Sequence, residues 1–114
     1  MTWEEAAAFA LSLPGTETGT TYGMPAVKVA ANGRAFLSRG HEADTSFVLS
    51  LAEDRVELLK VTDPDSFWQT AHYEGWPAVL VRYDCADDDR VREVIAEARD
   101  WAAARPKART RRQT

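Results

Sequence analysis

Residues 22–29 read Tyr-Gly-Met-Pro-Ala-Val-Lys-Val, and residues 72–81 read His-Tyr-Glu-Gly-Trp-Pro-Ala-Val-Leu-Val. In both stretches a glycine and a proline come directly before an apolar run. Glycine permits backbone conformations that other residues avoid, and proline fixes φ, so each stretch predicts the place where a strand begins. The order of these two stretches along so short a chain is the strongest indication of the fold.

Helices are predicted at both ends. Thr2 and Glu5 have the spacing of a capping box, and apolar residues at helical spacing follow until Pro14-Gly15 stops the helix. A second periodic segment, 87–104, begins with acids that the helix dipole favours. A short helix is expected near 53–60, and Asp63-Pro64 opens a further short turn.

Asn32-Gly33 predicts a hairpin, because both residues tolerate the positive φ of a type I′ turn. A two-residue loop would set 29 opposite 36 and 28 opposite 37, with Val27, Val29 and Phe36 facing the core. Lys28 and Arg39 would then be diagonal neighbours on the outer face. Residues 15–23 are expected to be a loop. Further strands are predicted at about 45–51 and 78–83 by their alternating or continuous apolar pattern.

Strands grouped between terminal helices indicate an α+β domain. We expect an antiparallel sheet with the N- and C-terminal helices packed on one face. A chain of 114 residues, 45% of them hydrophobic, has room for one core. We therefore assign residues 1–104 to a single domain and 105–114 to a basic, disordered tail.

The order and spacing of these motifs resemble the MmcQ/YjbR family of small bacterial proteins over about residues 5–102. The matching positions are Leu13, Pro14, Gly15, Glu17, Tyr22, Gly23, Pro25, Lys28, Val29, Gly33, Phe36, Asp63, Pro64, Phe67, His72, Tyr73, Trp76 and Pro77. The resemblance implies a fold similar to the frataxin-like sheet. It also implies DNA binding, the label that members of the family commonly carry.

The charges of the chain are segregated. Residues 105–114 hold five cations and no acid, whereas the rest of the chain has nine Lys and Arg against eighteen Asp and Glu. A basic tail of this kind is typical of proteins that meet a polyanion, and it is also typical of a solvated, disordered terminus.

The leading functional hypothesis is a nonenzymatic module that binds DNA weakly and largely without regard to sequence, through phosphate contacts. The candidate residues lie on the hairpin and in the tail: Lys28, Arg34, Arg39, Arg105, Lys107, Arg109, Arg111 and Arg112.

Two alternatives stay open. A protein- or small-ligand-binding surface could form from aromatic-type residues before the two strand starts, namely Tyr22, His72, Tyr73 and Trp76. An acidic ridge like that of frataxin-like proteins could bind a divalent cation or dock a partner, using Asp84, Asp87, Asp88, Asp89 and Glu93. Helix capping also explains the acids at 87–89.

No enzyme or cofactor motif is present, so we expect neither catalysis nor a cofactor, and His41 and His72 lack the spacing of a metal site. The single cysteine, Cys85, fits a reducing cytoplasm, and no leader or membrane-spanning stretch precedes the domain. We expect a cytoplasmic monomer that makes no membrane contact.

Overall fold

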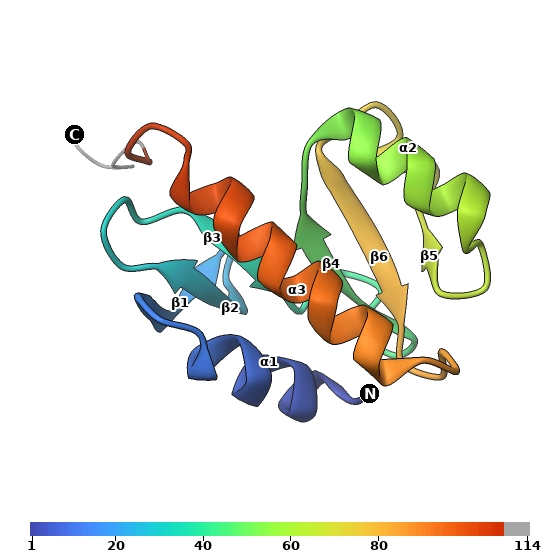
Figure 1. Cartoon of the computed structure of the whole chain (residues 1–114), viewed down its shortest axis with the longest axis horizontal. Helices are drawn as coiled ribbons and strands as arrows, with labels where there is room; N and C mark the ends of the chain where they lie inside the picture. The colour runs from blue at the N-terminus through green and yellow to red at the C-terminus, as the bar shows by residue number, and fades with distance from the viewer. Residues whose placement is uncertain (109–114) are drawn as a thin grey trace.

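Six antiparallel strands form one sheet in the order β1-β2-β3-β4-β6-β5 in the computed structural model, which describes residues 1–108 (Figure 1). The strands are β1 (Thr16–Thr21), β2 (Met24–Val29), β3 (Ala35–Ser38), β4 (Ser46–Ser50), β5 (Phe67–Trp68) and β6 (Ala78–Arg82). The helices are α1 (Trp3–Ser12), α2 (Glu53–Thr62), the single 3-10 turn η1 (Ala71–Tyr73) and α3 (Asp88–Ala103).

The three α-helices cover one face of the sheet. α3 runs diagonally across β2, β3 and β4, α1 packs beside it over β1 and β2, and α2 lies against β5 and β6 (Figure 1). Their apolar sides share one core with the inward residues of the strands, including Phe36, Phe47 and Val79. This is the α+β arrangement predicted from the sequence, with the terminal helices on one face of an antiparallel sheet.

The ends of the helices also agree with the sequence. The Thr2 hydroxyl accepts a hydrogen bond from the Glu5 amide and the Glu5 carboxylate accepts one from the Thr2 amide, so the predicted capping box is confirmed. Asp87 caps α3 by accepting from the Arg90 amide at 3.0 Å. Within residues 1–108, no helix combines the length and apolar character needed to cross a membrane.

The predicted loop 15–23 is wrong, because residues 16–21 form the edge strand β1. Glycines at 15, 19 and 23 suggested a loop, yet the threonines between them are β-branched and favour a strand. Tyr22 and Gly23 have φ of 52° and 78° and join β1 to β2 as a two-residue loop. The type I′ geometry expected at Asn32-Gly33 therefore occurs one hairpin earlier in the chain.

Asn32-Gly33 belongs to a longer loop. Among its residues only Gly33 has positive φ, and the Val29 carbonyl accepts from the Gly33 amide while the Val29 amide donates to the Arg34 carbonyl, both at 2.8 Å. The predicted pairing is wrong as a result: Val27 lies opposite Leu37 and Lys28 opposite Ala35, with Phe36 as the extra residue of a bulge. Val27, Val29 and Phe36 still face the core, as predicted.

The face of the sheet away from the helices is partly covered by residues 69–77. Val48 and Leu80 are paired across β4 and β6 and are buried, although they lie outside the main core. Tyr73 of η1 reaches this face, because its hydroxyl lies 3.9 Å from where a Cβ on Gly40 would be. A second, thin layer of packing thus forms beneath the loop that precedes β6.

Candidate functional site

The β2–β3 loop is joined to the end of α3 by one buried side chain. The Asn32 amide nitrogen donates to the Ala102 carbonyl at 2.8 Å and to the Arg105 carbonyl at 3.0 Å. The backbone carbonyl of Asn32 in turn accepts from the Ala108 amide at 2.7 Å. The contacts of this loop with the chain after α3 therefore extend to Ala108.

This junction places three of the predicted DNA-binding cations at one end of the molecule, which is at the left of Figure 1. The Arg34 Nε donates to the Pro106 carbonyl at 2.8 Å, so its guanidinium lies against the segment that carries Arg105 and Lys107. The Arg105 guanidinium lies 4.5 Å from the centre of the Trp101 ring. We call Arg34, Arg105 and Lys107 the cationic end. Arg109, Arg111 and Arg112 lie outside the described residues.

The Lys28 side chain extends over β1. Its stem runs across Gly19 of β1, where an added Cβ would come within 2.9 Å of Lys28 Cδ, and Glu17 is its cross-strand partner. The negative charge of Glu17 on the neighbouring strand makes phosphate binding by Lys28 less favourable.

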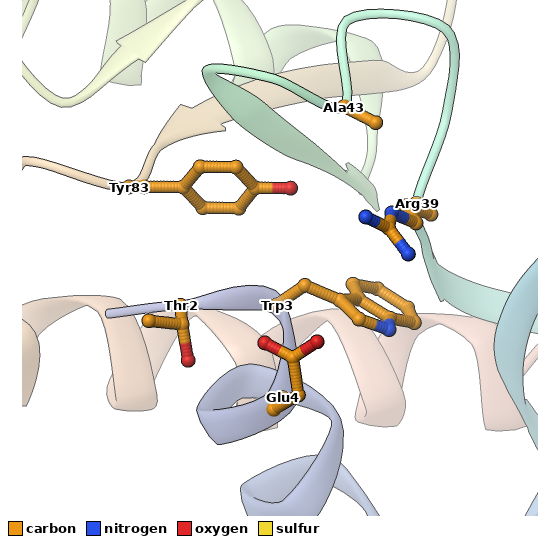
Figure 2. Close-up of a pocket in the computed structure, with 6 residues that line it drawn as sticks. All are labelled: Thr2, Trp3, Glu4, Arg39, Ala43 and Tyr83. Carbon is orange, nitrogen blue, oxygen red and sulfur yellow. The ribbon is translucent and has the colours of Figure 1, made fainter.

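Arg39 lies apart from the cationic end, and the predicted diagonal pairing of Lys28 with Arg39 is wrong. The bulge shifts the register, so the Arg39 amide donates to the Pro25 carbonyl at the far end of the hairpin from Arg34. The Arg39 side chain instead lines a cavity with Trp3 and Tyr83 (Figure 2).

Three of the four residues of the alternative site come together, namely His72, Tyr73 and Trp76. The His72 ring meets Tyr73 edge-on with centroids 5.1 Å apart and stacks on Trp76 at 6.4 Å with an interplanar angle of 16°. Trp76 is 58% exposed and Tyr22, at the tip of the β1–β2 hairpin, is 83% exposed. Burial is the main cause that raises the pKa of Tyr73, and the charges of Glu42 and Tyr22 add to the effect.

Gln69 holds that aromatic group in place, a role the sequence did not reveal. Its amide nitrogen donates to the carbonyls of Tyr73 at 2.9 Å and Ala78 at 2.7 Å, while its oxygen accepts from Lys60 Nζ at 2.7 Å. A side-chain amide that bridges a loop to the next strand has no local sequence signal, because its partners are backbone groups.

Three of the five acids of the proposed ridge have structural partners. Asp87 caps α3, Asp88 accepts from the Met1 backbone amine at 3.2 Å, and Asp89 pairs with Arg92 at 2.8 Å. Across residues 1–108, no three His, Cys, Asp or Glu side chains are grouped closely enough to hold a metal ion. Helix capping and ion pairing thus explain Asp87, Asp88 and Asp89.

Cys85 is half-buried at the turn after β6. Burial is the main cause that raises the pKa of its thiol, with Asp88 and Asp63 adding to the effect, although the N-terminal amine opposes it. The thiolate is therefore disfavoured, which suits a structural cysteine better than a nucleophile.

Comparison with known proteins gives the family of the chain but no individual relative. Neither the curated proteins nor the solved structures contain a match. A family model described as YjbR does match, over residues 11–101. This span begins in α1 and ends in α3, so it takes in the whole sheet, and the chain accordingly belongs to the YjbR family.

Proposed function

We propose that this protein is a nonenzymatic module that binds the phosphate backbone of nucleic acid through its cationic end. The observation that supports this most is the junction at Asn32, which fixes Arg34 beside the segment with Arg105 and Lys107. Two cations of this set come from the chain after α3 and one from the hairpin, so the fold itself assembles them.

The sequence continues from this end with Arg109, Arg111 and Arg112. Together with the cationic end they give six positive charges that can reach one stretch of backbone. The body of the chain carries a net charge of −9 and repels phosphate elsewhere. Binding is therefore expected through one end only, to depend steeply on salt, and to be largely independent of base sequence. The single half-buried cysteine supports the proposal that this takes place in the cytoplasm.

A two-dimensional NMR titration of the full chain with a short DNA duplex tests the proposal. Binding by the cationic end would shift the amide signals of residues 30–34 and 105–108 and leave those of 71–76 unchanged. Shifts confined to 22 and 71–76 would contradict it, and so would no shift at about 50 mM salt, where phosphate contacts are strong.

A second candidate function rests on the aromatic group. Trp76 keeps a large exposed surface beside the His72 ring, and Tyr22 at the hairpin tip is also exposed. Exposed aromatics of this kind are enriched at the centre of protein interfaces. We propose a protein- or ligand-binding role for it as the alternative. Replacing Trp76 with Ala would abolish that binding and leave the DNA titration unchanged.

A further inference from the structure

A cavity of about 240 Å³ opens between the start of α1, the loop after β3 and the end of β6 (Figure 2). This volume is below the roughly 300–1,000 Å³ of sites for drug-sized molecules, so it suits a small ligand. Segments far apart in the sequence supply its walls, which are Thr2, Trp3, Glu4, Arg39, Ala43 and Tyr83.

The Tyr83 hydroxyl points into this cavity in the direction of Arg39 (Figure 2). Its oxygen is buried and has no hydrogen-bond partner within residues 1–108. The ring is held by stacking on Phe47, with centroids 6.1 Å apart. Because buried polar groups are nearly always satisfied, an unpaired hydroxyl aimed into a cavity marks the place for an acceptor atom that a ligand would bring.

Arg39 supplies the charge. Its guanidinium faces the cavity beside the Trp3 indole (Figure 2), and none of the hydrogen bonds or ion pairs described for residues 1–108 uses it. A guanidinium offers two parallel N–H groups, the geometry that a carboxylate accepts best. Burial raises the pKa of the Tyr83 hydroxyl, so at neutral pH it keeps its proton and is a second donor.

The surrounding charges favour a monoanion over a dianion. Glu4 lines the cavity together with Arg39. Its carboxylate repels a doubly charged phosphate more strongly than a singly charged carboxylate, which the Arg39 guanidinium can neutralise. The flat indole of Trp3 forms an apolar wall against which a planar group would pack.

We propose that this cavity binds a small planar monocarboxylate, with its carboxylate between the Arg39 guanidinium and the Tyr83 hydroxyl and its apolar body against Trp3. The site is distinct from the cationic end, because Arg39 and Arg34 lie at opposite ends of β3. Trp3 of α1 lines it, so it lies on the side of the sheet that the helices cover.

Benzoate titrated into the full chain, observed through the tryptophan indole N–H signals, tests this site. The Trp3 signal, assigned with Trp3→Phe, is expected to shift saturably with benzoate. Benzamide has the same shape without the charge, and phenyl phosphate adds a charge, so both should bind about tenfold more weakly or worse. No saturable shift with benzoate, or equal affinity for benzamide, would overturn the proposal.

Tyr83→Phe is the decisive variant, because it removes only the unpaired hydroxyl. It is expected to weaken benzoate binding about tenfold while leaving the stability of the free protein unchanged or higher. Arg39→Gln should weaken binding at least as much. The matched control is Tyr22→Phe at the exposed tip of the β1–β2 hairpin, which should bind like the wild type. Equal benzoate affinity in Tyr83→Phe and wild type would overturn the assignment of the hydroxyl.

Discussion

The Asn32 side chain donates to the Ala102 carbonyl at 2.8 Å across seventy residues of sequence. The Ala102 carbonyl lies in the last turn of α3, where it also accepts from the Arg105 amide at 3.1 Å. The Asn32 contact fixes the β2–β3 loop to the helix that covers the sheet. The hairpin and the C-terminal segment therefore act as one structural unit, on which the cationic end depends.

Asn32→Ala should lower the free energy of unfolding by about 2 kcal/mol, because it removes the side-chain hydrogen bonds to the Ala102 and Arg105 carbonyls and the one from the Arg34 amide. Urea denaturation measures this directly. Thr20→Ala, at an exposed position of β1, is the control and should stay within about 0.5 kcal/mol of the wild type. If the two variants were equally stable, Asn32 would not hold the junction.

Tyr22→Asn should stabilise the protein by about 0.5 kcal/mol, because asparagine tolerates the φ of 52° better than an aromatic residue. Gly23→Ala, at φ of 78°, should destabilise it by about 1 kcal/mol or more. Both changes are measured by urea denaturation. A clear loss of stability in Tyr22→Asn would mean that the exposed tyrosine contributes packing that outweighs the backbone strain.

Stability should fall in alkaline solution. Burial raises the pKa of Tyr73 and Tyr83 above the ordinary value of 10.0, so the unfolded chain loses these protons first. Their contribution is fully present below pH 10 and is lost as the pH rises past that value. The double variant Tyr73→Phe/Tyr83→Phe should show a flatter decline between about pH 9 and 11 than Tyr22→Phe. Identical profiles would contradict the assignment.

Gln69→Ala should loosen the loop that carries His72 and Trp76. With its donors to the Tyr73 and Ala78 carbonyls removed, amide hydrogen exchange in residues 71–76 should quicken about tenfold. Lys60→Ala removes only the bond to the Gln69 oxygen and should have a smaller effect. Unchanged exchange in Gln69→Ala would show that packing against the sheet alone holds the loop.

The helices, the fold class and the core face of β2 were predictable, because caps and apolar periodicity are local signals. Turn chemistry was recognised, but the type I′ loop was assigned to Asn32-Gly33 although Tyr22-Gly23 adopts it. A tertiary contact determines the conformation of the Asn32-Gly33 loop, because the Asn32 side chain donates to the Ala102 carbonyl at the end of α3. Because the loop is longer than a two-residue turn, β2 and β3 pair in another register than the predicted one, with a bulge at Phe36. Arg39 is therefore not a neighbour of Lys28.

The candidate sites were predictable only in part. His72, Tyr73 and Trp76 are neighbours in sequence, so their grouping follows from one loop. The cavity brings together Trp3, Arg39 and Tyr83, which no spacing rule connects. Only the packing of α1 against the sheet creates it.

The salt dependence of DNA binding tests the central claim most directly. Fluorescence anisotropy of a labelled duplex would compare the wild type with Arg105→Gln/Lys107→Gln and with the matched double variant Arg90→Gln/Arg92→Gln, about 20 Å away along α3. The account predicts that the plot of log affinity against log salt becomes shallower by about two only in Arg105→Gln/Lys107→Gln. Equal slopes in all three proteins, or no binding at about 50 mM salt, would contradict it.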